Sequence, residues 1–272
     1  MGLRQGFAAP GCNPSPVEGA AVDPVALEHL TSPEVAARVA AGWTTCLIPI
    51  GSNEQHGPHL PTMTDSAYGR ALGERVARAL GKAFVAPCIA VGCSDHHMEF
   101  PGTISLRRET LQAVVTDYCR TLAQHGITDL VLLPTHGGNF PPLEAMLADL
   151  RRAVAPARVH YLIDLDTAFD RFYQVAAKDG ISTGVAGAHA GEVETSIMLA
   201  LHGNLVQMDK AAPGFTGDYR EAREDFKNKT WKQVTGNGVV GDPTQGDRAR
   251  GQRYIDTDVA ATVALLKEAL KR

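Results

Sequence analysis

The residues best suited to chemistry follow an apolar run, TCLIPI at 45–50, in the segment PIGSNEQHGPHLPTMTD. Glu54 and His56 are two positions apart, so their side chains point to the same side if the chain stays extended. Asp65 comes nine residues after His56. Two carboxylates and an imidazole are ligand types that hold Zn²⁺ or Mn²⁺. A polar loop with Asp65 as a helix cap explains the same residues, so this segment leaves both interpretations open.

A second segment of this kind is LLPTHGGNF. His136 comes directly after the strongly apolar run 129–135, and Gly137 and Gly138 allow the backbone to turn sharply and to approach a ligand closely. A tight turn capped by Asn139 is the alternative. If the two apolar runs are neighbouring strands, His136 lies beside the first cluster, which favours a metal site.

The segment AGAHAGEVETS offers His189 and Glu192 at an expected helix start. An acidic residue in a first helical turn also complements the helix dipole, and a histidine before a helix is often structural. Glu194 carries the same carboxylate, and spacing alone does not decide between the two glutamates.

A further polar segment, GCSDHHMEFPGTISL, supplies candidate pocket residues. They are Ser94, His96, His97 and Glu99. A polar loop that leads into a strand explains each of them equally well.

Strand-like apolar runs alternate with stretches of helical periodicity along the chain. We expect strands at 45–50, 83–87, 102–106, 129–135 and 157–164. We expect helices over 65–81, over 111–126, from about 139, over 191–203 and over 257–272, with mostly loop and some helix at 204–253. This alternation predicts an α/β fold with a mostly parallel sheet covered on both faces. Such sheets bind ligands at the carboxyl ends of their strands, which is where the candidate residues fall.

The composition is that of an ordinary globular protein, with 272 residues, 44% of them hydrophobic, and a net charge of −4. It excludes disorder of the whole chain, a basic nucleic-acid-binding face and a membrane span. We expect a flexible N-terminal extension at 1–22, without the apolar stretch of a signal peptide, and one domain over 23–272. The five cysteines lie among apolar neighbours without a CxxC pair, which favours a reducing, cytoplasmic location.

Taken together, these segments resemble the creatininase (creatinine amidohydrolase) family. The matching motifs, in the family's order, are GSNEQHGPHLPTMTD, H-x-x-F-P-G-T at 97–103, THGGN at 135–139, HAGEVETS at 189–196 and GVVGDPT at 238–244. The resemblance implies a three-layer α/β/α fold, two divalent metal ions (Zn²⁺ and/or Mn²⁺) and a homo-oligomer, commonly a hexamer. It also implies hydrolysis of a non-peptide C–N amide bond, often in a cyclic amide.

The resemblance assigns a role to each matching residue of the cluster. It implies that Glu54 and His136 hold one metal ion, that His56 holds the other, and that Asp65 bridges both. His189 is then the acid/base group beside the metals.

One position departs from the pattern of creatininase itself. There, a glutamate two residues after the matching histidine ligates the second metal, whereas this chain has Gly138. We therefore expect Glu192 to complete the second metal site, with Glu194 in reserve. The expected substrate-binding residues are Ser94, His97, Gly137 and Gly138.

The expected function is a metal-dependent amidohydrolase acting on a small molecule, through water activated by two metal ions. The substrate is a cyclic amide such as creatinine, or a related amide or formamide, and Gly138 weakens the case for creatinine. A metal-dependent lactonase or isomerase using the same pocket is the alternative. A scaffold with structural zinc is disfavoured, because such sites are usually rich in cysteine and no cysteine falls in the clusters. The charged run 220–232 is either a subunit contact or a solvated helix face.

Overall fold

A parallel β-sheet forms the middle of the molecule in the computed structural model, which describes residues 24–271. Its four strands lie in the order β2-β1-β3-β4, and all three pairings are parallel. The strands are β1 (Thr45–Ile50), β2 (Ala83–Val85), β3 (Asp129–Pro134) and β4 (Arg158–His160). The expected N-terminal extension at 1–22 lies outside the described residues.

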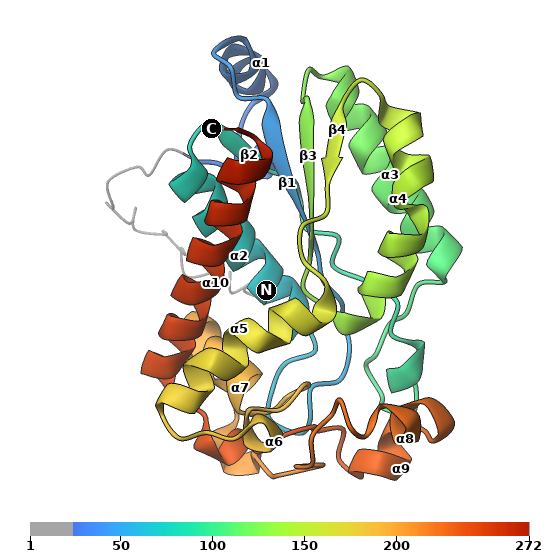
Figure 1. Ribbon diagram of the computed structural model, residues 1–272, viewed down its shortest axis with the longest axis vertical. Coiled ribbons are helices and arrows are strands. Elements are labelled where there is room, and N and C mark those ends of the chain that lie inside the picture. The colour runs from blue at the N-terminus through green and yellow to red at the C-terminus, as the bar shows by residue number, and fades with distance from the viewer. Residues whose placement is uncertain (1–23, 272) are drawn as a thin grey trace, which may run out of the picture.

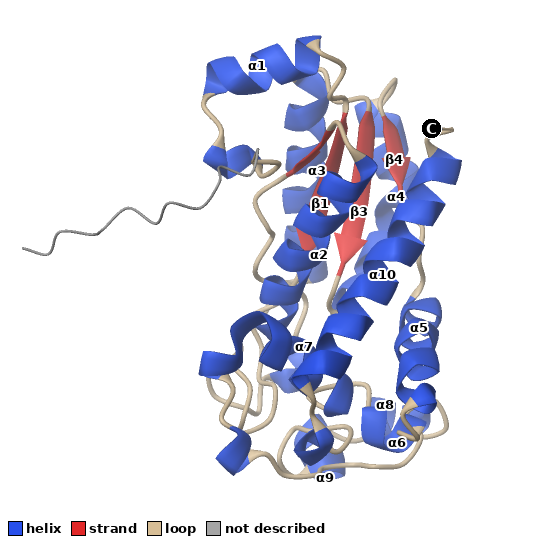
Figure 2. Cartoon of the chain, turned by 90° about the vertical axis from the view of Figure 1, so that its left-hand side faces the viewer, coloured by secondary structure: helices blue, strands red, loops and turns tan. Residues whose placement is uncertain are grey.

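Helices cover both faces of this sheet (Figures 1 and 2). Those that precede or follow the strands directly are α1 (Ser32–Ala40), α2 (Thr64–Leu80), α3 (Arg108–Gln124), α4 (Phe140–Val154) and α5 (Leu165–Lys178). The remaining α-helices of the described chain are α6 (Thr183–Ala186), α7 (Glu192–His202), α8 (Arg223–Asn228), α9 (Trp231–Thr235) and α10 (Arg248–Ala269).

The strands bury both of their faces, because alternate residues enter two different cores. In β1, Leu47 packs in the core formed with α2, α5, α7 and α10. Cys46 and Ile48 pack in the core formed with α3 and α4. Val131 and Leu132 divide between the two cores in the same way. The expected three-layer α/β/α fold is confirmed.

The strand order places a topological switch point between β1 and β3. From β1 the chain continues through α2 to β2 on one side, and then crosses to β3 on the other side. The loops that leave the carboxyl ends of β1 and β3 therefore diverge and open a crevice, which is where open α/β sheets bind ligands. The carboxyl ends of β1 and β3 point downward in the view of Figure 2.

Three of the expected elements differ from the structure. The predicted strand at 102–106 is wrong: Ile104 makes only an isolated bridge to Asn53, and its side chain stays 55% exposed. The predicted strand at 157–164 is shorter, because β4 is an edge strand that leaves the sheet after His160. The last helix begins earlier than expected, at Arg248, because Asp247 accepts a hydrogen bond from the Arg250 N–H and caps it.

Cysteine burial agrees with the apolar environment expected from the sequence. Cys46, Cys93 and Cys119 are buried free thiols and Cys88 is half-buried, while Cys12 lies outside the described residues. Between residues 24 and 271, none of the helices has both the length and the apolar character needed to cross a bilayer.

Candidate metal centre

The loop after β1 and the first turn of α2 bring three of the expected residues together. Glu54, His56 and Asp65 are all buried, and their ligand atoms form a group compact enough for one metal ion. His56 donates its Nδ1 hydrogen to the carbonyl oxygen of Glu54, 3.1 Å away. Its other nitrogen, Nε2, then faces Oδ1 of Asp65 at 3.2 Å. A backbone carbonyl on the far nitrogen is the usual way to orient a metal-binding histidine.

His136 joins this group from the end of β3. Its Nδ1 lies 3.3 Å from Oε1 of Glu54 and 3.2 Å from Oδ2 of Asp65. Its Nε2 donates to the carbonyl oxygen of Cys93 at 2.9 Å, so Nδ1 is the nitrogen left free for a ligand. The neighbouring loops are packed too closely for a side chain at Gly138, where a Cβ would lie 2.1 Å from that same carbonyl oxygen. A glutamate at this position therefore does not fit this backbone.

Two carboxylate oxygens of the cluster have no hydrogen-bond partner. They are Oε1 of Glu54 and Oδ2 of Asp65, and both are buried. An unpartnered buried acceptor costs free energy, and here both acceptors face the same imidazole nitrogen. A divalent cation would satisfy all three atoms, so the donor set fits a metal ion.

The charges of the cluster lead to the same conclusion. Burial alone would raise the pKa values of Glu54 and Asp65, but the facing imidazoles outweigh it, and both pKa values are lowered. Burial alone would lower the pKa of His56, yet the carboxylates of Asp65 and Glu194 raise it to about 10. The ionised carboxylates thus require compensating positive charge, which protons or metal ions can supply.

The structure separates the two glutamates of α7. Oε2 of Glu194 lies 3.6 Å from Nε2 of His56, and the two residues form a possible metal-binding group with His189. Glu192 belongs to none of the metal-binding groups found in the described chain. It is fully buried and accepts hydrogen bonds from Arg250 and Tyr254 at 2.5 and 2.6 Å. Two positions on a helix differ by about 200°, so only one of the two glutamates can face the cluster.

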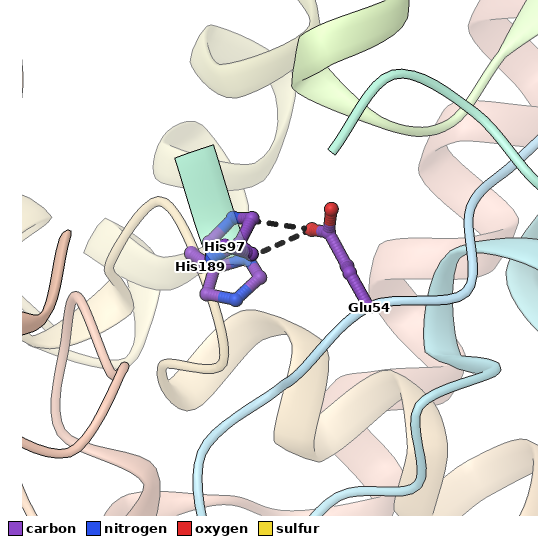
Figure 3. Close-up of side chains that lie close together, drawn as sticks. All are labelled: Glu54, His97 and His189. Atoms are coloured by element: carbon purple, nitrogen blue, oxygen red, sulfur yellow. Dashed lines mark ion pairs between the residues drawn. The ribbon is translucent and has the colours of Figure 1, made fainter. Parts of the chain in front are cut away.

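His97 and His189 stack on one another at the open side of Glu54 (Figure 3). Nε2 of His97 and Nδ1 of His189 lie 3.4 and 3.6 Å from Oε1 of Glu54. Gln55 fixes both rings: its side-chain N–H donates to Nδ1 of His97, and its main-chain carbonyl oxygen accepts from Nε2 of His189. The lone pair of His189 Nδ1 therefore points to the cluster. Burial, together with the positive charge of His56, lowers the pKa of His189 to about 3, so the ring is neutral at pH 7.

The remaining expected residues lie in the pocket, in the layer behind it or at the surface. Gly137 and Gly138 line the cavity at the cluster. Ser94 is fully buried behind His136, with its Oγ 2.5 Å from Oγ of Ser52. Glu99 is exposed.

Sequence reasoning missed Trp231, in the segment that we expected to be a subunit contact or a solvated helix face. Its ring lies 4.3 Å from His97 and 5.2 Å from His189, measured between ring centroids. It also packs against Phe226, so α8 and α9 turn an aromatic face to the site. The segment TWKQ has the pattern of a capping box at a helix start, with Thr230 and Gln233 as its two partners, but nothing in the sequence indicates what the helix covers.

Comparison with known proteins agrees with this fold. The model of a family described as Creatininase: Creatinine amidohydrolase matches residues 28–266. A mycofactocin precursor peptide peptidase of Mycobacterium ulcerans (strain Agy99) is 33% identical over 78% of this chain and 80% of its own. Creatinine amidohydrolase of Pseudomonas putida is 36% identical over 67% of this chain and 74% of its own. A solved structure named Creatininase Mn has a TM-score of 0.76 at 29% identity and covers 90% of this chain and 98% of its own.

The fold and the cluster thus define a three-layer α/β/α protein with a candidate metal centre at the switch point of its sheet. More particularly, the chain belongs to the creatininase family, as its motifs predicted. Its relatives include both a creatinine amidohydrolase and a peptidase, so membership of the family does not choose between non-peptide and peptide C–N bonds.

Proposed function

We propose that the protein is a metal-dependent hydrolase that cleaves a non-peptide C–N amide bond in a small molecule. The observation that carries this proposal is the convergence of two unpartnered, buried carboxylate oxygens on Nδ1 of His136. An unpartnered buried acceptor costs free energy, and a cation bound between these atoms would remove that cost.

Two groups of side chains would hold the metal ions. Glu54, Asp65 and His136 would hold one, and His56, Asp65 and Glu194 the other, with Asp65 shared. In this arrangement Glu194 takes the place that we expected Glu192 to fill. Divalent ions such as Zn²⁺ or Mn²⁺ lower the pKa of a water molecule and polarise a substrate carbonyl oxygen. Creatininase Mn, the structural neighbour, is named for one of these ions.

Protein side chains provide the proton transfer. Nδ1 of His189 is unprotonated and faces the cluster, so it can accept a proton from the attacking water. The protonated ring can then return this proton to the departing nitrogen. The main-chain carbonyl oxygen of Gln55 holds the ring in place throughout. Gly137 and Gly138 line the cavity at the cluster, and their backbone N–H groups are our candidates for binding the oxyanion.

The test combines metal analysis with a hydrolysis screen of creatinine, other lactams and formamides. We expect Asp65→Asn and His136→Ala to lose metal content and activity together. We expect His189→Gln to retain its metal content and to lose about 10²–10⁴-fold in kcat. Mass spectrometry must find a new amine and a new carboxylic acid in the products. Products without a new amine and a new carboxylic acid would favour the alternative hypothesis of a lactonase or an isomerase.

Peptide-bond hydrolysis is a second candidate, because the mycofactocin precursor peptide peptidase covers more of this chain than the creatinine amidohydrolase does. The same metal ligands and the same base serve either bond. Incubation with a mixture of short peptides, followed by mass spectrometry, separates the two candidates. Cleavage of peptides but not of lactams or formamides would select the second.

A further inference from the structure

The cavity at the metal centre continues well beyond the candidate ligands. It has a volume of about 420 Å³. From Glu54, His136 and His189 it extends along β3 and beneath α5, as far as residues of α2 and α10. Cavities of roughly 300–1,000 Å³ suit drug-sized ligands, so a single five-membered ring would leave much of this space unfilled.

Apolar side chains form the wall that α5 gives to this cavity. Leu165, Ala168, Phe169 and Phe172 all line it. They follow the i, i+3, i+4, i+7 spacing of one helix face, so the whole inner face of α5 is apolar. Val131 and Leu133 of β3 continue the apolar surface on the side of the sheet.

The polar groups at the far end of the cavity already have partners. Asp258 accepts hydrogen bonds from Arg171 and from Tyr68, both at 2.6 Å. Arg171 also donates to Thr262 at 3.2 Å. A ligand that reached this end would find no free charge, and a polar ligand would lose its hydration without compensation.

We propose that the substrate carries an extended apolar arm, which occupies this cavity while the scissile amide lies at the metal ligands. The inference rests on the proposed function, because it takes the cluster as the reacting centre. Transfer of the arm from water to these walls supplies affinity, and the length of the arm sets specificity. Ala168 is the position that determines this specificity, since a larger residue there would fill the space beneath α5.

Two homologous series of substrates test the proposal. Primary alkanamides place the arm on the acyl side, and N-alkylformamides place it on the amine side, each from one to six carbons. We expect kcat/KM to rise with each methylene group in at least one series, by up to about fourfold per group. A flat or falling profile in both series, with the shortest members still hydrolysed, would overturn the inference and leave the proposed function standing.

A matched pair of variants on α5 tests whether the dependence of kcat/KM on chain length arises in this cavity. Ala168 lines the cavity, whereas Ala177, on the same helix, is exposed and does not line it. In Ala168→Phe we expect the ratio of kcat/KM between the longest and shortest members to fall at least tenfold, and in Ala177→Phe we expect the wild-type ratio. Equal ratios in the two variants would overturn the assignment of the arm to this cavity.

Binding to the metal-free protein provides a readout that does not depend on catalysis. Calorimetric titration with n-alkanols from butanol to octanol should give affinities that rise with chain length in the wild type and in Ala177→Phe, but not in Ala168→Phe. Affinities that do not depend on chain length contradict the inference, even if no amide is hydrolysed. A change of oligomeric state in Ala168→Phe, with unchanged alkanol binding, would identify the cavity as a subunit contact and overturn the inference as well.

Discussion

Whether a buried carboxylate can bind a metal ion depends on the groups that face its oxygens. Oε1 of Glu54 and Oδ2 of Asp65 face histidine nitrogens and have no hydrogen-bond donor. Glu192 is equally buried, yet Arg250 and Tyr254 satisfy both of its oxygens. Burial of a carboxylate therefore indicates a metal ligand only where its oxygens remain free.

The two glutamates of α7 give a prediction at this scale. Glu194→Gln should lose about one of two bound metal ions and leave the unfolding temperature of the metal-free protein nearly unchanged. Glu192→Gln should keep its metal content but lose about 3 kcal/mol of stability, because Arg250 loses its charged partner in a buried site. Elemental analysis and thermal unfolding of both variants provide the check. Loss of metal in Glu192→Gln alone would restore the assignment made from the sequence.

At the scale of the elements, the carboxyl ends of the strands carry the chemistry and the opposite ends carry stability. Asp129 begins β3 at the end of the sheet far from the cluster. Its carboxylate lies 2.7 Å from Arg158 and 2.8 Å from His160, and both partners belong to β4. This pair of contacts holds the short edge strand against the sheet.

The pH dependence of stability should report this contact. Burial opposes ionisation of Asp129, but hydrogen bonds from Arg158 and His160 outweigh it and lower the pKa of its carboxyl group. A carboxyl group whose pKa is lowered by folding stabilises the native state above its unfolded pKa of about 3.9, and this contribution disappears as the pH falls through the folded value. We expect Asp129→Asn to cost about 1–2 kcal/mol at pH 7. In urea unfolding, the difference from the wild type should shrink below about pH 4, and a difference that stays constant would contradict this account.

At the scale of the whole molecule, the sheet brings distant segments of the chain to one place. The candidate ligands come from the loop after β1, from α2, from the end of β3 and from α7, and the aromatic cover comes from α9. All of them meet at the switch point of the sheet, which explains how one sheet can position them.

The assembly expected from the family provides the prediction at this scale. We propose that the protein forms a homo-oligomer, and the family resemblance favours a hexamer. Light scattering coupled to size-exclusion chromatography should then give about six times the chain mass of 29.0 kDa. A monomeric mass would contradict this proposal.

The sequence alone determined the strands β1 and β3, the layers around them, and most of the candidate ligands. The two strands can be recognised in the sequence because a strand buried on both faces needs a continuous apolar run. Glu54, His56 and His136 can be recognised as candidates because they closely follow those runs. Only the tertiary structure shows that Glu194, and not Glu192, faces the cluster, since the packing of α7 against α10 fixes which way each helical position points. It also decided what Trp231 covers and how far the cavity extends, because both depend on contacts between segments that are distant along the chain.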